Sequence, residues 1–250
     1  MATQQVYTIE QMALDIVALM DHLKVASAHL IGHSMGGRIA LSLAQNFPGR
    51  VKSLIMAASG SGPAARPGSD CIPGLPHRLV LDMVEMGFEK FIYEEIVESD
   101  TFFTKDYRER HRDKVEEFYK LAWATHAKLP EFIHLCMARH NFEGTHRLGD
   151  VKAPTLVLIG EADTVGSNHI AQSKVLVERI PGAKMKILKD QSHGFFLAGV
   201  GRDQCCNPRL GEEAQRTLGR FLRTLSPEAT TPTLCCKLPC LRSPWTDLFA

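Results

Sequence analysis

The stretch LIGHSMGGRIALSLA, Leu30–Ala44, decides how the rest of the chain is interpreted. An aliphatic run precedes Ser34 and an amphipathic run follows it. Gly32 and Gly36 flank the serine in the pattern G-x-S-x-G, which is typical of a sharp turn between a strand and a helix. Small neighbours allow the chain to bend there, and the turn lifts the hydroxyl above the sheet. The stretch therefore predicts a strand, a turn that presents Ser34, and a helix.

Strand and helix signals alternate on both sides of this turn. Apolar residues at helical spacing follow Thr8, which has capping-box spacing to Gln11. Short apolar runs predict strands, and amphipathic periods predict further helices. The predicted strands are Ala28–Gly32, Val51–Ala58, Thr155–Gly160 and Lys184–Leu188, and the helices are Met35–Phe47, His169–Ile180 and Glu212–Leu225. This order predicts an α/β fold, with a parallel sheet and flanking helices.

Two regions interrupt the alternation. The stretch His77–Gly149 has helical character with many charges and aromatic residues, and Gly60–Pro76 before it is a linker rich in Gly, Pro and Ser. Ser226–Ala250 holds four prolines and three cysteines without periodicity, which predicts a poorly ordered tail. We therefore divide the chain into two parts of one core, an inserted helical cap and a tail. Their bounds are 1–59 and 150–225 for the core, 60–149 for the cap and 226–250 for the tail.

Composition excludes several classes of function. The chain has 250 residues, of which 44% are hydrophobic, and a formal net charge of +1. A balanced charge offers no bulk electrostatic argument for nucleic-acid binding, and no apolar run has the length of a membrane span. The polar stretch Met1–Tyr7 does not resemble a signal peptide. The seven cysteines do not form an even disulfide framework, so we expect a reducing, cytoplasmic location.

Metal binding is not predicted. Cysteines occur in two adjacent pairs, Cys205-Cys206 and Cys235-Cys236, and at Cys240. Only Cys236 and Cys240 have the spacing of zinc ligands, which is too little for a site.

The chain contains a candidate base for Ser34, whose hydroxyl is a poor nucleophile alone. His193, in KDQSHGFF, follows the last buried strand, where a loop can reach the serine. The Met35 N–H, at the start of the next helix, is the predicted donor to a developing negative charge. For His33 we expect a packing role, because the residue before the nucleophile should point into the fold. Four histidines of the helical region could line a pocket or face solvent: His126, His134, His140 and His146.

A histidine base needs a carboxylate that fixes its tautomer. The stretch LIGEADTVG ends a strand and offers Glu161 and Asp163. Asp163 lies farther along the turn and is better placed to reach the next loop, so we prefer it and keep Glu161 as the alternative. The resulting order, Ser34, Asp163, His193, is the order expected of α/β-hydrolases.

On these motifs the chain resembles α/β-hydrolases of the single-domain esterase, lipase and C–C hydrolase type. GHSMGG resembles the family's nucleophile turn, APTLVLIGEADTV its acid-bearing strand, and IPGAKMKILKDQSHGFF its last strand and histidine loop. Ser192 stands where the family more often has glycine. The resemblance covers about Thr8–Leu225. It implies a helical cap at this place and no metal or organic cofactor.

The resemblance implies a serine hydrolase that acts on a small-molecule ester or related acyl compound. In this reading Ser34 attacks the carbonyl, His193 moves the proton, and Asp163 orients His193. Cleavage of a C–C bond or a thioester with the same triad is an alternative.

The family usually has about four strands before the helix that starts here at Thr8, and a loop that supplies a second oxyanion donor. The sequence contains neither, so we expect Ala28–Gly32 to form an exposed edge strand, which favours self-association. We also expect weak catalysis, because a single oxyanion donor is worth about 10²–10³ in turnover. A catalytically weak or inactive truncated homologue that acts by association is therefore a further alternative.

Deletion of Ser226–Ala250 tests the tail. We expect the melting temperature to stay nearly unchanged, because the tail lacks a periodic apolar face that could pack. A fall of many degrees in a thermal melt would show instead that the tail covers apolar surface.

Overall fold

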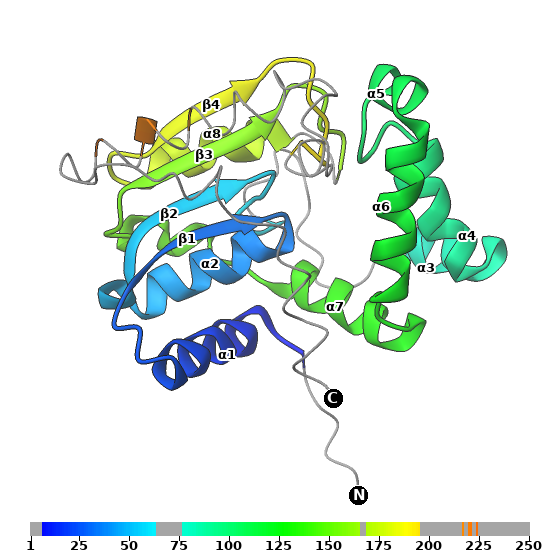
Figure 1. The fold of residues 1–250 in the computed structure, drawn as a ribbon. Helices are drawn as coiled ribbons and strands as arrows, with labels where there is room; N and C mark the ends of the chain where they lie inside the picture. The colour runs from blue at the N-terminus through cyan, green and yellow to red at the C-terminus, as the bar shows by residue number, and fades with distance from the viewer. Residues whose placement is uncertain are drawn as a thin grey trace, which may run out of the picture.

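The sheet of the protein has four parallel strands in the order β1-β2-β3-β4 (Figure 1). The computed structural model describes residues 7–63, 77–165 and 169–195, together with residues 217, 220, 221 and 224. The strands are β1 (Ala28–His33), β2 (Val51–Ala57), β3 (Thr155–Gly160) and β4 (Lys184–Leu188). The four strands and their parallel arrangement confirm the predicted α/β fold.

Helices α1 (Ile9–His22), α2 (Met35–Asn46) and α8 (His169–Arg179) pack against one face of the sheet. The Gln11 N–H donates to the Thr8 hydroxyl over 3.0 Å, so Thr8 caps α1 as its spacing predicts. Along β2, the side chains alternate between two buried clusters. Leu54 and Met56 join the cluster of these helices, whereas Ile55 and Ala57 join a second cluster that contains Phe195 and Phe221. Strands buried on both faces explain why their sequences are continuously apolar.

Strand β1 forms one edge of this sheet, because within the described residues it pairs only with β2. Ile31 on this strand is 52% exposed. Helix α1 adds the exposed side chains of Leu14, Leu19 and Leu23. The expected apolar edge is therefore present in the described part of the chain.

The segment between β2 and β3 is helical, as predicted. It contains α3 (His77–Met86), α4 (Phe88–Tyr93), the π-helix η3 (Glu94–Glu98), α5 (Lys105–Arg110), α6 (Arg112–Ala124) and α7 (Leu129–Asn141). Helices α3 to α6 stand beside the sheet, and α7 leads back toward it (Figure 1). Phe91, Val97, Phe103 and Val115 belong to a separate buried cluster within this helical segment, residues 77–141, to which the name cap refers below. The cap therefore has a core of its own.

The chain after α7 packs with the sheet and not with the cap. Phe142 and Leu148, the latter in the 3₁₀ helix η4 (Thr145–Asp150), are part of the main core cluster. The Gly144 N–H also donates to the Ser61 carbonyl over 2.8 Å. In the structure, the cap helices thus end at α7, earlier than the expected bound at residue 149.

Several expectations lie outside the described residues. These are most of the linker at 64–76, the tail at 226–250, and most of the predicted helix at 212–225, of which residues 217, 220, 221 and 224 are helical. Among the helices that the structure describes, none is both long and apolar enough to cross a membrane.

The exposed edge predicts a charge-sensitive self-association. Replacing Ile31 with lysine should raise the monomer fraction, because an edge charge opposes strand addition. Light scattering after gel filtration over a concentration series measures this. The matched control is Leu121→Lys in the cap, where Leu121 is 68% exposed and far from the sheet edge in sequence. A wild-type protein that stays monomeric at every concentration would contradict the expectation.

Candidate active site

Ser34 occupies a strained turn between β1 and α2. Its φ of 53° and ψ of −121° lie in a region that a residue with a side chain adopts at an energetic cost. Three hydrogen bonds hold the turn: Ser34 N–H to the Ala57 carbonyl (2.9 Å), Gly37 N–H to the Ser34 carbonyl (3.0 Å), and the Ser59 hydroxyl to the same carbonyl (2.7 Å). The end of β2 therefore supports the serine from below.

Two glycines make this turn sterically possible. A Cβ at Gly32 would lie 2.3 Å from the Gly36 carbonyl oxygen, and one at Gly37 would lie 2.4 Å from the Ser59 Oγ. At Gly36, in contrast, a Cβ would meet nothing within 4 Å. The expectation that Gly36 must be small is therefore wrong in steric terms. Gly37, the next residue of GHSMGG, is the position with tight packing, which the sequence had predicted at Gly36.

His193 and Asp163 form a buried pair. The His193 Nδ1–H donates to Asp163 Oδ2 over 2.9 Å, and the two side chains are 2% and 0% exposed. The Val165 N–H donates to the second carboxylate oxygen over 3.0 Å, which fixes the carboxylate plane. Glu161 is exposed and accepts a hydrogen bond from the Asp190 N–H instead. The structure therefore brings Asp163, and not Glu161, to His193.

The loops that carry this pair are joined through their backbones. Glu161 N–H donates to the Leu188 carbonyl over 2.9 Å, and Ala162 N–H to the Gln191 carbonyl over 2.8 Å. A Cβ at Gly160 would lie 2.3 Å from the Gln191 oxygen, so only glycine permits this approach. The end of β3 and the histidine loop thus behave as one unit.

His33 forms a hydrogen bond to the histidine loop in addition to its packing role. Its Nε2–H donates to the His193 carbonyl over 2.8 Å, and the two imidazole rings lie 4.9 Å apart. Burial, followed by the charge of His193, lowers the pKa of His33. The lowered pKa favours the uncharged form of His33. Sequence reasoning missed this supporting role, because the partner is a backbone atom far along the chain.

The cap contacts the histidine loop through Phe102. The Ser192 hydroxyl and the Gly194 N–H donate to the Phe102 carbonyl over 2.6 and 2.7 Å. The Phe102 ring meets the His193 ring edge-on, with centroids 5.5 Å apart. Ser192, which departs from the family's usual glycine, therefore links the cap to the loop that carries His193.

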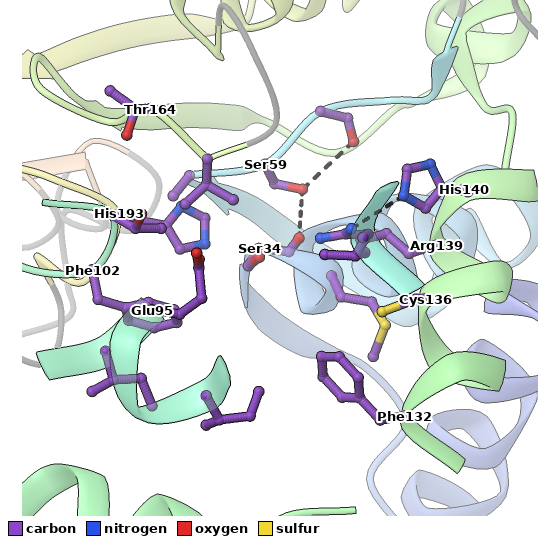
Figure 2. Close-up of a pocket in the computed structure, with 18 of the residues that line it drawn as sticks. Ser34, Ser59, Glu95, Phe102, Phe132, Cys136, Arg139, His140, Thr164 and His193 are labelled. Carbon is purple, nitrogen blue, oxygen red and sulfur yellow. Dashed lines mark hydrogen bonds between the residues drawn. The ribbon is translucent and has the colours of Figure 1, made fainter. Parts of the chain in front are cut away.

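Ser34, Met35 and His193 open onto one cavity of about 650 Å³, a volume typical of small-molecule sites. Figure 2 shows His193, Phe102 and Glu95 on one side of Ser34, and Phe132, Cys136, Arg139 and His140 on the other. The cavity lies between the sheet and the cap, since η3 and α7 supply both side walls.

The four histidines that were expected to line a pocket or face solvent divide into two groups. His126 and His140 line the cavity, whereas His134 and His146 are exposed. No group of three or more potential metal ligands occurs in the residues that the structure describes. The cysteines weighed as zinc ligands lie outside them.

A family comparison agrees with this architecture. The profile of the family described as alpha/beta hydrolase fold matches residues 2–200. The chain is 28% identical over 153 residues to a 2-hydroxy-6-oxononadienedioate/2-hydroxy-6-oxononatrienedioate hydrolase of Paraburkholderia phymatum, which covers 58% of this chain and 49% of that protein. A hydrolase of the same name from Escherichia coli is 24% identical over 184 residues, covering 70% and 59%. The chain thus spans about half the length of the curated relatives it matches.

Solved structures resemble the fold over most of the chain. An enol-lactonase from Burkholderia xenovorans has a TM-score of 0.68 at 25% identity, covering 88% of this chain and 75% of its own. Est816, described as an N-acyl homoserine lactone degrading enzyme, has a TM-score of 0.63 at 26% identity, covering 88% and 77%.

The link between cap and histidine loop is open to test. Ser192→Ala removes one hydrogen bond to Phe102, and we expect the free energy of unfolding to fall by about 1 kcal/mol. Urea unfolding measures this. Lys189→Ala, at an exposed position of the same loop, serves as the control and should change stability little. Equal stability of the two variants would show that the Ser192 hydroxyl contributes nothing.

Proposed function

The chain belongs to the α/β hydrolase fold family, and from that premise we propose that it is a serine hydrolase of small esters or related acyl compounds. Ser34 is the proposed nucleophile, His193 the base and Asp163 the orienting acid. The cysteine usage favours a cytoplasmic location as part of this proposal.

The observation that carries the proposal is the buried His193–Asp163 pair beside the strained Ser34 turn. A carboxylate 2.9 Å from Nδ1 fixes the imidazole tautomer, so Nε2 is the nitrogen that serves as the base. The His193 Nε2 takes the Ser34 hydroxyl proton as the serine oxygen attacks the carbonyl carbon of the substrate. It then gives that proton to the leaving group, and water releases the acyl group by the reverse sequence. Asp163 stabilises the imidazolium that forms in each half of the reaction.

The start of α2 supports charge stabilisation in the same cavity. Met35 is the first residue of this helix, where a backbone N–H has no acceptor within the helix. Its amide is the proposed donor to the oxyanion, and the helix dipole favours negative charge at the same end.

A second candidate is hydrolysis of a carbon–carbon bond by the same residues. It is favoured by the relatives named as 2-hydroxy-6-oxononadienedioate/2-hydroxy-6-oxononatrienedioate hydrolases, whose names contain a ketone. A ketone offers no ester oxygen as leaving group, so its hydrolysis to an acid must break a C–C bond. Comparing turnover of a short-chain aryl ester with that of a vinylogous 1,5-diketone separates the two candidates.

Triad substitutions test both candidates. Ser34→Ala should abolish covalent labelling by a fluorophosphonate, and Asp163→Asn should lower turnover by about 10³–10⁴ because the imidazole tautomer is no longer fixed. Gel-based labelling and ester kinetics measure these outcomes.

The matched control is Glu161→Gln, the carboxylate of the same turn that does not meet His193. It should retain wild-type labelling and turnover. Labelling that persists in Ser34→Ala, or a loss in Glu161→Gln as large as in Asp163→Asn, would overturn the assignment.

A further inference from the structure

Glu95 places a carboxylate in the wall of the active-site cavity. It is the second residue of the π-helix η3, a rare helical form that often occurs at functional sites. In the described part of the chain, its carboxylate has no ion pair and no hydrogen bond, and its backbone carbonyl accepts one from the Ser99 hydroxyl. Phe91, Ile92 and Ile96 line the cavity from the same segment. The acid is therefore set among apolar side chains without a protein partner.

The charged form of such a carboxylate is unfavourable, because no protein group stabilises it. Burial raises the pKa of Glu95, because an apolar environment disfavours its charged form. Glu95 is partly buried, so its charged form loses part of its hydration and gains no protein partner in return. A cation delivered by a ligand would supply the missing partner and favour the ionised form.

The position of Glu95 indicates which part of a ligand it meets. Figure 2 shows Glu95 and His193 on the same side of Ser34, and Arg139 on the other. His193 gives its proton to the leaving group, so the leaving group must lie on the His193 side. The acyl group then points toward Arg139, whose guanidinium has His140 Nε2 at 3.2 Å. The cavity is thus polarised, with the acid at the leaving-group end.

Aromatic rings add to the preference for a cation. Phe91 and Phe102 line the cavity together with Glu95. The face of an aromatic ring carries partial negative charge and therefore attracts an ammonium ion.

From this arrangement we propose that Glu95, Phe91 and Phe102 form a subsite for a leaving group that carries an ammonium ion. The inference rests on the proposed ester hydrolysis and names the substrate class within it: esters of amino alcohols.

A matched pair of esters tests the subsite. The butyrate ester of choline and its uncharged carbon isostere, 3,3-dimethylbutyl butyrate, differ in charge but hardly in shape. Wild-type protein should prefer the choline ester in kcat/KM. Glu95→Gln should lower the ratio of the two kcat/KM values about tenfold, because it removes the charge and keeps the size. A general loss of activity lowers both kcat/KM values equally, so it does not change their ratio.

Glu94→Gln is the matched control, since it makes the same change one residue earlier on η3, outside the cavity lining. It should keep the wild-type ratio. Glu95→Asp, which retains the charge, should keep more of the preference than Glu95→Gln and guards against a folding defect in one variant. A ratio unchanged in Glu95→Gln, or lowered equally in Glu94→Gln, would overturn the subsite.

A binding measurement separates this inference from the proposed function. Calorimetry on Ser34→Ala compares the affinities for the two esters, with and without Glu95→Gln. If the wild-type protein hydrolyses neither ester but Ser34→Ala still prefers the choline ester through Glu95, the subsite stands and the ester hydrolase fails. If hydrolysis occurs and neither kinetics nor binding depends on Glu95, the subsite fails and the hydrolase stands.

Discussion

The strained backbone of Ser34 is the constraint on which the site depends. A positive φ at a residue with a side chain persists only where the surroundings hold it, and here the support comes from the end of β2 and from Ser59. Gly32 and Gly37 are needed in the same turn, because a Cβ at Gly32 would overlap the Gly36 carbonyl oxygen and one at Gly37 would overlap the Ser59 hydroxyl. The turn thus places the hydroxyl and the first amide of α2 at the same point of the cavity.

Around this turn, hydrogen bonds from three different elements hold the histidine loop in position. The loop is tied to the end of β3 by Ala162, to β1 by His33 and to the cap by Ser192. Hydrogen bonds are short and directional, so three of them from different elements leave the loop little freedom. The cap therefore contributes to the geometry of His193 as well as to the walls of the cavity.

The ionisable side chains at the site occupy distinct positions around Ser34 and His193. Burial lowers the pKa of His33 next to His193, and Asp163 is the acid that contacts the imidazole of His193. Glu95 and Arg139 lie on opposite sides of Ser34 (Figure 2).

The sequence alone predicted the strands, the helices of the sheet layer, and the order Ser34, Asp163, His193. These features depend on short-range signals: apolar runs, helical periods, and a G-x-S-x-G turn whose residues are adjacent in the chain. The choice of Asp163 over Glu161 also came from position along one turn.

The sequence could not show that Gly37 packs where Gly36 does not, that His33 holds the His193 carbonyl, or that Ser192 bonds to Phe102. Each of these contacts joins atoms that are distant in the chain or depends on the direction of a side chain. Likewise, nothing in the pattern of the cap set Glu95 apart from its neighbours Glu94 and Glu98. Only the tertiary structure decided which of the three acids faces the cavity, because the helix orientation is set by the packing of the cap and not by local sequence.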